Sequence, residues 1–282
     1  MKKVFKEFHI RTSPFQPDIL SGLLWELNIT GLTEEDNFIN VYAGNDLSRD
    51  TVENFLLKLK KEKVIDDYSL DEYEFENVNW NEEWEKNLNI IKVTDKIVIK
   101  PLSKEYKSSP GEIVITIDPK MSFGTGEHQT TKLMLMLLEK YIKNGKVLDV
   151  GSGTAVLAIA SVKFGANYAV AIDNDELCYE NGKENTALNN VSDKVDIRIG
   201  EIKDIKENDF DFVIANIQKN VIIKIAGEIK EKLKSDGTII LSGLLSEDEA
   251  DVIQTYESFN FYLMEKRTMD EWIALVMKEG RR

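Results

Sequence analysis

The chain has 282 residues, of which 42% are hydrophobic, and it carries a formal net charge of −14 at pH 7. This length suits two modest domains or one large one. This negative charge disfavours nucleic-acid partners and suits a basic protein partner. Solubility alone is an alternative explanation of the charge. One cysteine and two histidines exclude an internal disulfide and a cysteine- or histidine-rich metal site. Without a signal peptide or an apolar run of roughly 18 residues, the sequence predicts a cytoplasmic protein with no membrane partner, and a monomer is favoured.

The first part of the chain switches between strand and helix patterns. Strand patterns lie near 3–10, near 37–43 and in a stretch that ends near 78, and helix patterns lie at 17–28 and 49–62. This succession predicts a small ferredoxin-like α+β domain over residues 1–78. Residues 79–94 are predicted to connect it to the rest, with Trp80 and Trp84 on one face of a short helix. Simple packing of the two tryptophans against a domain is compatible with the same spacing.

From residue 95 to residue 282, apolar strands alternate with amphipathic helices. Strands are predicted at 146–150, 168–172, 194–199, 210–215, 237–242, 259–266 and 271–277, and the first three helices at 128–142, 154–164 and 175–189. This rhythm predicts an α/β domain with a Rossmann-like, seven-stranded and mostly parallel sheet covered on both faces. The short link between the last two strands makes that pair antiparallel.

Ligands of such sheets bind beyond the carboxyl ends of the strands, and several unusual residues fall there. Gly151 and Gly153 follow a strand and let the backbone approach a ligand closely. A dinucleotide loop would have a third glycine where this chain has Val156. Asp173 lies 22 residues after Gly151 at the end of the next strand, where a carboxylate can accept hydrogen bonds from both hydroxyls of a ribose. The alternative role of Asp173 is a helix N-cap, but Asp175 can serve as that cap and leave Asp173 for the ligand.

Two further segments belong to the same predicted edge. Asn216 ends a later strand, where its amide could contact an amine and a cofactor or simply form a turn. The loop DPKMSFGTGEHQTTK carries Phe123, which can cover a ligand, and Thr130 and Thr131, which can cap the following helix or bind a carboxylate. His128 in this loop is either a general base or a structural residue.

In combination, these motifs resemble the PrmA-type family, which methylates ribosomal protein L11. Asp118 to Thr131 is similar to the family's DPG-x-x-FGTG-x-H-x-TT loop, and Val147 to Ala160 to its VLD-x-G-x-GSG-x-LAIA motif. Asp173, the segment Ala215 to Gln218, Trp272 and the terminal GRR also match, so the resemblance covers nearly the whole chain. The chain departs from the family pattern at Ala155 and Lys120, which replace glycines, and at Gln129, which replaces a frequent proline.

The resemblance implies a class I methyltransferase that uses S-adenosylmethionine, a cofactor without a phosphate, so the third glycine is dispensable. It implies that the first domain recruits ribosomal protein L11 and that the acceptors are lysine side chains and an N-terminal α-amine. The implied cofactor-binding residues are Phe123, Thr130, Thr131, Asp149, Gly151, Gly153, Asp173 and Asn216. Asn216 is also the implied catalytic residue, since no dedicated base is evident.

Three alternatives stay open. One is a methyltransferase of the same fold that acts on another protein or a small amine. The second is a non-catalytic cofactor-binding or ribosome-associated protein, which Ala155 in place of glycine makes conceivable. The third is a nicotinamide dehydrogenase, which the missing glycine disfavours. For Ala155 itself we expect an ordinary helical conformation in a helix that starts near Thr154, because alanine rarely adopts a positive φ.

Overall fold

A computed structural model describes residues 4–35, 37–44, 46–76, 88–120 and 124–280. The chain forms two compact units, residues 1–84 and 85–282, each of which is described by itself. The predicted connector helix with Trp80 and Trp84 lies outside the described residues.

The first unit has the element order β-α-β-β-α-β. Its elements are β1 (Val4–Ser13), α1 (Pro17–Leu24), β2 (Gly31–Glu34), β3 (Ile39–Gly44), α2 (Arg49–Lys61) and β4 (Asp67–Glu76). The strands form one antiparallel sheet in the order β2-β3-β1-β4, which is the ferredoxin-like arrangement. Apolar residues of the sheet, such as Phe8 and Val41, are buried with Leu24 of α1 and Leu56 of α2 in a core of their own.

The second unit is built on a seven-stranded sheet in the order β10-β9-β8-β11-β12-β14-β13. These strands are β8 (Lys146–Val150), β9 (Tyr168–Asp173), β10 (Val195–Ile199), β11 (Phe210–Asn216), β12 (Leu233–Leu245), β13 (Phe261–Met269) and β14 (Trp272–Glu279). The first five run parallel, and β14 pairs antiparallel with both β12 and β13. The predicted seven-stranded, mostly parallel sheet is therefore confirmed, as is the antiparallel final pair.

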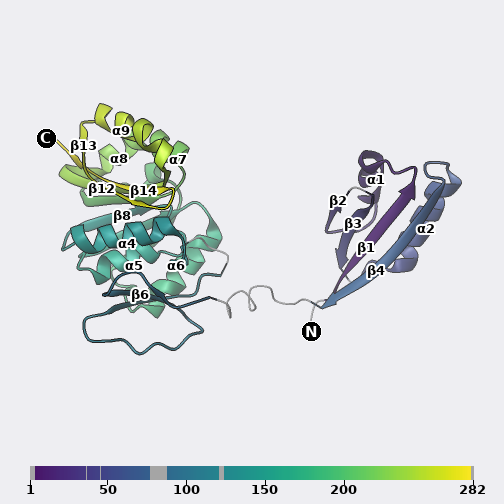
Figure 1. Cartoon of the computed structure of the whole chain (residues 1–282), viewed down its shortest axis with the longest axis horizontal. Helices are drawn as coiled ribbons and strands as arrows, with labels where there is room; N and C mark the ends of the chain where they lie inside the picture. The colour runs from purple at the N-terminus through teal and green to yellow at the C-terminus, as the bar shows by residue number, and fades with distance from the viewer. Residues whose placement is uncertain (1–3, 36, 45, 77–87, 121–123, 281–282) are drawn as a thin grey trace. The chain divides into compact units, whose positions relative to one another are not determined.

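Helices cover both faces of this sheet (Figure 1). On one face lie α4 (Gln129–Tyr141), α5 (Val156–Lys163) and α6 (Glu176–Leu188), and on the other lie α7 (Lys219–Lys224), α8 (Ala226–Lys232) and α9 (Glu249–Ser258). Short 3-10 turns lie at η1 (Ile202–Asp204) and η2 (Ser246–Asp248). Each face has its own hydrophobic core, because residues at alternate positions of β8, such as Val147 and Leu148, point to opposite sides.

A small sheet lies beside α5 and α6. It consists of β5 (Ile91–Lys92), β6 (Ile97–Pro101) and β7 (Ile113–Ile117), in that order. Its apolar residues, such as Ile99 and Ile115, join the same core as α4 and α5. The strand β7 leads directly into the segment that begins at Asp118.

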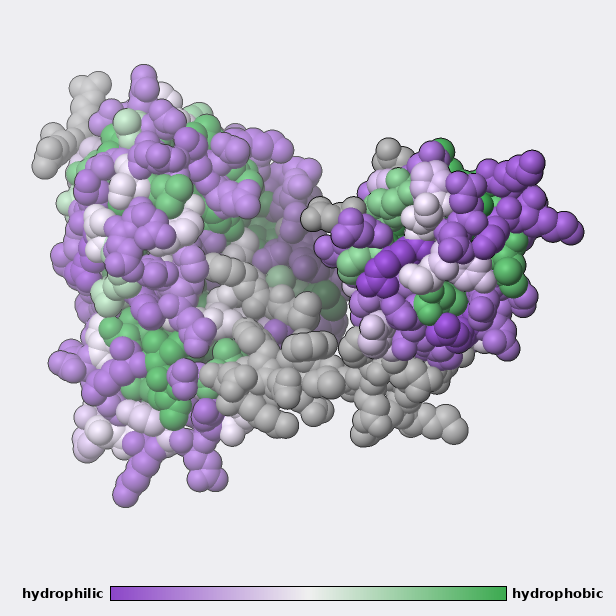
Figure 2. Space-filling model, turned by 45° about the vertical axis from the view of Figure 1, so that its right-hand side comes forward, coloured by the Kyte–Doolittle hydropathy of each residue, from purple (hydrophilic) through white to green (hydrophobic). Residues whose placement is uncertain are grey.

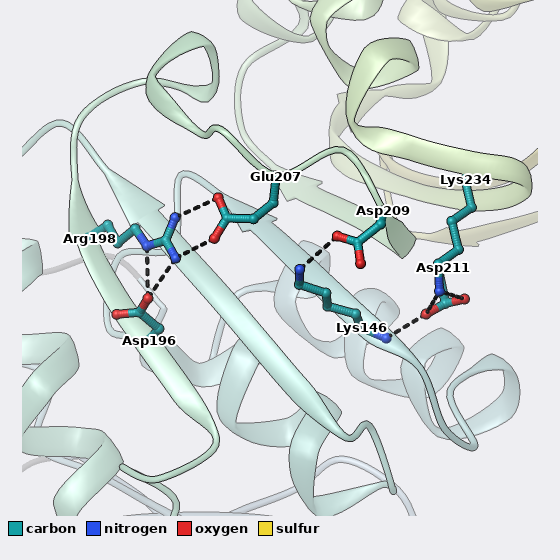
Figure 3. Close-up of polar contacts among 7 residues, drawn as sticks. All are labelled: Lys146, Asp196, Arg198, Glu207, Asp209, Asp211 and Lys234. Atoms are coloured by element: carbon teal, nitrogen blue, oxygen red, sulfur yellow. Dashed lines mark hydrogen bonds and ion pairs between the residues drawn. The ribbon is translucent and has the colours of Figure 1, made fainter.

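Ion pairs link strands of the sheet to one another and to the segment before β11 (Figure 3). Arg198 of β10 binds both carboxylate oxygens of Glu207, at 2.7 and 3.0 Å, and also binds Asp196. Lys146 of β8 binds Asp209 at 2.7 Å. Lys146 begins β8 and Asp209 precedes β11, so these two charges are paired at the amino-terminal ends of their strands.

The surface in view in Figure 2 is covered mostly by hydrophilic side chains, with smaller hydrophobic groups between them. Among the described residues, no helix is both long and apolar enough to cross a membrane. Within the same part of the chain, no group of three or more histidine, cysteine, aspartate or glutamate side chains is arranged to hold a metal ion.

Candidate cofactor-binding site

A cavity of about 760 Å³ opens at the carboxyl ends of β8, β9 and β11. Gly151, Asp173 and Asn216 end or follow these three strands, and all three line the cavity. The position is the expected one for an open parallel sheet, and the volume is that of a small-molecule site.

The loop after β8 turns sharply under the cavity. Gly151 has φ +73°, and a Cβ atom there would lie 2.4 Å from Cγ2 of Ile217. Gly153 has φ +52°, and its N–H donates to Oδ2 of Asp173 at 2.9 Å. Both glycines are therefore needed for a close turn, as predicted, and the second is also tied to the next strand.

The conformation expected for Ala155 is wrong. This residue has φ 62° and ψ 18°, which is the left-handed region, and α5 begins after it at Val156. Its methyl group is fully buried, and a Cβ atom built on Gly182 of α6 would lie 3.5 Å from it. Alanine thus occupies a position whose backbone favours glycine.

Asp175 caps a helix and Asp173 lines the cavity, as the sequence suggests. Asp175 is the N-cap of α6, and its Oδ1 accepts a hydrogen bond from the N–H of Leu177 at 2.9 Å. Asp173 lines the cavity and accepts from Gly153 and, at 3.1 Å, from the N–H of Asp175. A carboxylate has about four acceptor positions, so Asp173 retains capacity for a ligand.

Asp149 is fully buried one layer below the cavity. Its Oδ2 accepts from the N–H of Ala158 in α5 at 3.1 Å, and its Oδ1 has no partner in the part of the chain that the structure describes. Burial is the main reason that the pKa of this carboxyl is raised from 3.8 to about 7. The hydrogen bond from Ala158 lowers this pKa, and the charge of Asp173 raises it. Asp149 does not line the cavity. We therefore infer that it stabilises the start of α5 and does not contact a ligand directly.

The wall formed by α4 places one threonine at the cavity and one behind it. Thr130 lines the cavity, whereas Thr131 is buried and lies 3.5 Å, through its Oγ1, from Nδ2 of Asn216. The N-cap of α4 is His128 rather than either threonine, since its Nδ1 accepts from the N–H of Thr130 at 3.3 Å. The ring of His128 also packs edge-on against Trp272, with centroids 4.8 Å apart.

The structure thus brings most of the predicted residues to one cavity. Thr130, Gly151, Gly153, Asp173 and Asn216 line it. Thr131 and Asp149 stand behind these residues, and Phe123 lies outside the described residues.

Other lining residues were not predicted as site residues from the sequence. Gly200, Glu201 and Lys203 follow β10, and Gln218 follows β11. The rule that placed Asp173, the end of a parallel strand, would have found them too. Trp272 enters from β14, and only pairing of distant strands brings it to the cavity.

The cavity and the loop beneath it have three features that suit S-adenosylmethionine. Asn216 lines the cavity, as Asp173 does, and its buried Oδ1 has no partner among the described residues. Ser152, between the two glycines, has a buried hydroxyl without a partner. Val150, Ile172 and Ile202 supply apolar walls for a flat ring. Such unpaired buried polar atoms are rare and indicate a missing partner.

Comparisons with known proteins show which family the chain resembles. The family model described as ribosomal protein L11 methyltransferase (PrmA) matches residues 24–280. A Ruminiclostridium cellulolyticum protein named ribosomal protein L11 methyltransferase is 36% identical over 255 residues, which cover 86% of this chain and 79% of that protein. A Brevibacillus brevis protein of the same name is 33% identical over 313 residues, covering 98% of this chain and 99% of that one. The crystal structure of a ribosomal protein L11 methylase from Lactobacillus delbrueckii subsp. bulgaricus is 26% identical, with a TM-score of 0.64, and covers 69% of this chain and 99% of that one.

Proposed function

Because the chain belongs to the ribosomal protein L11 methyltransferase (PrmA) family, we propose that it transfers methyl groups from S-adenosylmethionine to amino groups of ribosomal protein L11. The observation that carries the proposal is the cavity at the carboxyl ends of β8, β9 and β11, where Asp173 and Asn216 meet the glycine loop. Lysine side chains and the N-terminal α-amine are the proposed acceptors. Because a ribosomal protein is the substrate, the proposal places the activity in the cytoplasm.

Each part of the cofactor has a suitable neighbour in the cavity. Asp173 would accept hydrogen bonds from the ribose hydroxyls. Gly151 and Gly153 would allow close approach of the backbone, and Thr130 would contact the polar methionine end. The cofactor supplies a methyl group on a positively charged sulfur, which needs no further activation by the protein.

The protein's own task is to present a neutral amine in line with that methyl group. A free lysine has a pKa of about 10.4, so the amine must lose a proton before it attacks. The unpaired Oδ1 of Asn216 can accept an N–H of the neutral amine and so direct its lone pair. Thr131, through its contact with Nδ2, would hold the amide in this orientation.

We propose that the first unit recruits the protein substrate. Residues 1–84 contain 9 basic and 18 acidic side chains, which gives a net charge of −9. Such a field attracts a basic protein and repels a nucleic-acid backbone. The proposal therefore includes no direct contact with RNA.

Mass spectrometry of purified ribosomal protein L11 incubated with the enzyme and S-adenosylmethionine labelled in the methyl group tests the proposed function. We expect labelled methyl groups on lysine side chains and on the N-terminal amine. Label on other ribosomal proteins but not on L11 would contradict the proposed substrate. Cofactor binding without any transfer would contradict the proposed activity.

A further inference from the structure

Three asparagines form a buried row along one side of α6. Two of them lie within the helix, and the third directly follows its last residue. Asn181, Asn185 and Asn189 are spaced four residues apart, so they share one face. Each has at most 6% of its surface exposed. Buried amides are costly unless all their hydrogen bonds are made, so their partners reveal what the row holds.

The row binds the backbone at the end of β7 in the way a neighbouring strand would. Asn189 accepts from the N–H of Thr116 at 3.0 Å and donates to its carbonyl at 2.6 Å. Asn185 does the same with Asp118, accepting at 2.8 Å and donating at 3.2 Å. Asn181 donates to the carbonyl of Asp118 as well, at 2.8 Å.

Asn185 differs from Asn189 because it also reaches the glycine loop. Its Nδ2 donates to the carbonyl of Thr154 at 3.1 Å. Thr154 in turn donates through Oγ1 to the carbonyl of Gly124 at 2.8 Å. Two ties therefore join the loop beneath the cavity to the described residues on either side of residues 121–123.

These ties connect two walls of the same cavity. Gly151 and Gly153, on the loop that Thr154 continues, line one wall. His128 and Thr130, which follow Gly124, line another. The spacing between the walls thus depends on the hydrogen bonds of Asn185 and Thr154, although neither side chain lines the cavity.

An ion pair between Lys120 and α6 reinforces the same junction. Lys120 has φ +45°, a conformation that favours the glycine found here in the family pattern, and its ammonium pairs with Glu184 of α6. Glu184 precedes Asn185, so the ion pair holds residue 120 against the helix that binds residue 118. The pair is well exposed and adds less to the junction than the buried amides.

We propose that Asn185 and Thr154 are positioning residues that set the distance between the glycine loop and the segment leading into α4, and thereby the affinity for the cofactor. This inference rests on the proposed use of S-adenosylmethionine. Neither side chain lines the cavity, so we expect no contact of either with the cofactor or the reacting atoms. Their effect passes through Gly153 on one side and through His128 and Thr130 on the other.

The first test compares two identical substitutions in one row. Asn185→Asp keeps the acceptor for Asp118 but removes the donor to Thr154, together with the donors to Asp118 and Asn181. Asn189→Asp removes the donors to Thr116 and to the carbonyl of Asn185, neither of which reaches the glycine loop. Calorimetry should show the dissociation constant of S-adenosylmethionine rising at least tenfold in Asn185→Asp and less than threefold in Asn189→Asp. Equal effects of the two substitutions on affinity would reduce Asn185 to a merely structural residue and overturn the proposal.

The second test uses Thr154 and remains decisive if Asn185→Asp does not fold. Thr154→Val keeps the shape of the side chain but loses the donor to Gly124, whereas Thr154→Ser keeps the hydroxyl. We expect weaker cofactor binding and faster amide hydrogen exchange over residues 124–130 in Thr154→Val, and near-normal values in Thr154→Ser. Exchange is measured without cofactor, so it judges the positioning role even if the wild type fails to bind S-adenosylmethionine, a result that would contradict the proposed function alone. Unchanged exchange in Thr154→Val would overturn the positioning role.

Discussion

Two aspartates near the glycine loop differ sharply in their surroundings. Asp173 lines the cavity and holds two backbone N–H groups, whereas Asp149 lies beneath it with one unpaired oxygen. Ligand binding and the pH dependence of folding are therefore assigned to different carboxyl groups. Each assignment can be tested with a single substitution.

Asp173→Ala should weaken the binding of S-adenosylmethionine by roughly 1–3 kcal/mol, because charge-assisted hydrogen bonds to the ribose are lost. Part of this loss comes from Gly153, whose N–H loses its acceptor. Asp175→Ala is the matched control, since it removes a helix cap of about 1 kcal/mol without removing a cavity residue. Calorimetry on both folded variants should show weaker binding only for Asp173→Ala, and equal affinities would remove Asp173 from the site.

Asp149 should make folding less favourable as the pH rises from about 4 to about 7. Its pKa is raised from 3.8 to about 7, chiefly by burial, so its stabilising contribution is complete below the unfolded value and lost as the pH passes the folded one. Asp149→Asn has no such titration and can still accept from the N–H of Ala158.

Denaturant unfolding of the cofactor-free protein at several pH values measures this difference. The free energy of unfolding of Asp149→Asn minus that of the wild type should increase across this window, by up to about 1.4 kcal/mol per pH unit, and level off above it. If the new amide destabilises the protein by an amount that does not depend on pH, the plot of this difference against pH shifts as a whole and keeps its slope. A flat difference would show that Asp149 titrates normally.

At the scale of elements, the start of α5 carries a backbone conflict. Ala155 lies in the left-handed region immediately before the helix, a conformation that costs alanine roughly 1–2 kcal/mol relative to glycine. The buried methyl group offsets part of this, at about 0.8 kcal/mol per carbon. We therefore expect Ala155→Gly to raise the free energy of unfolding by up to about 1 kcal/mol.

Ala160→Gly, inside the same helix and equally buried, provides the control. Glycine in a helix interior costs about 1 kcal/mol, so this variant should be less stable than the wild type. Thermal unfolding of the two variants should thus shift Tm in opposite directions. Two decreases of similar size would show that packing of the methyl group against α6 outweighs the backbone conflict.

The same helix shows where sequence reasoning succeeds and where it fails. Apolar runs correctly predict the strands β8 and β9, because buried parallel strands need them. The start of α5 was misplaced because propensity favours alanine in a helix, while the tertiary structure requires a left-handed turn. The four-residue strand β2 went unpredicted, since it holds one apolar side chain, Leu32, and depends on its pairing with β3.

The candidate site divides along similar lines. Gly151, Asp173 and Asn216 could be placed because each follows a strand, so local sequence fixes their edge of the sheet. The contact of His128 with Trp272 joins residues far apart in the chain, and periodicity carries no such information. The asparagines of α6 resemble ordinary polar helix positions until the backbone they bind is known.

At the scale of the whole molecule, the hydrophobic cores formed by the described residues share no side chains. One core lies in the first unit, and the other two lie on the faces of the seven-stranded sheet. A chain that begins at Glu85 should therefore fold and bind S-adenosylmethionine with nearly the affinity of the full protein. It should lose methylation of intact ribosomal protein L11, because the proposed recruiting unit is gone.

Calorimetry with the cofactor and mass spectrometry of the methylated substrate separate the two effects. The full-length protein, assayed at the same concentration, is the reference for both. Methylation at the full rate by the shortened chain would contradict the recruiting role of residues 1–84. Loss of cofactor binding would instead show that the units depend on each other.

The place of β14 in the sheet also orders events during protein synthesis. This strand, Trp272–Glu279, lies between β12 and β13 and is hydrogen-bonded to both. A nascent chain that has emerged only as far as β13 therefore exposes an open edge of β12, with Ile240 and Leu241 beside it. Residues up to 279 must therefore emerge before the sheet can close, so the central sheet of the nascent chain stays incomplete until β14 is available.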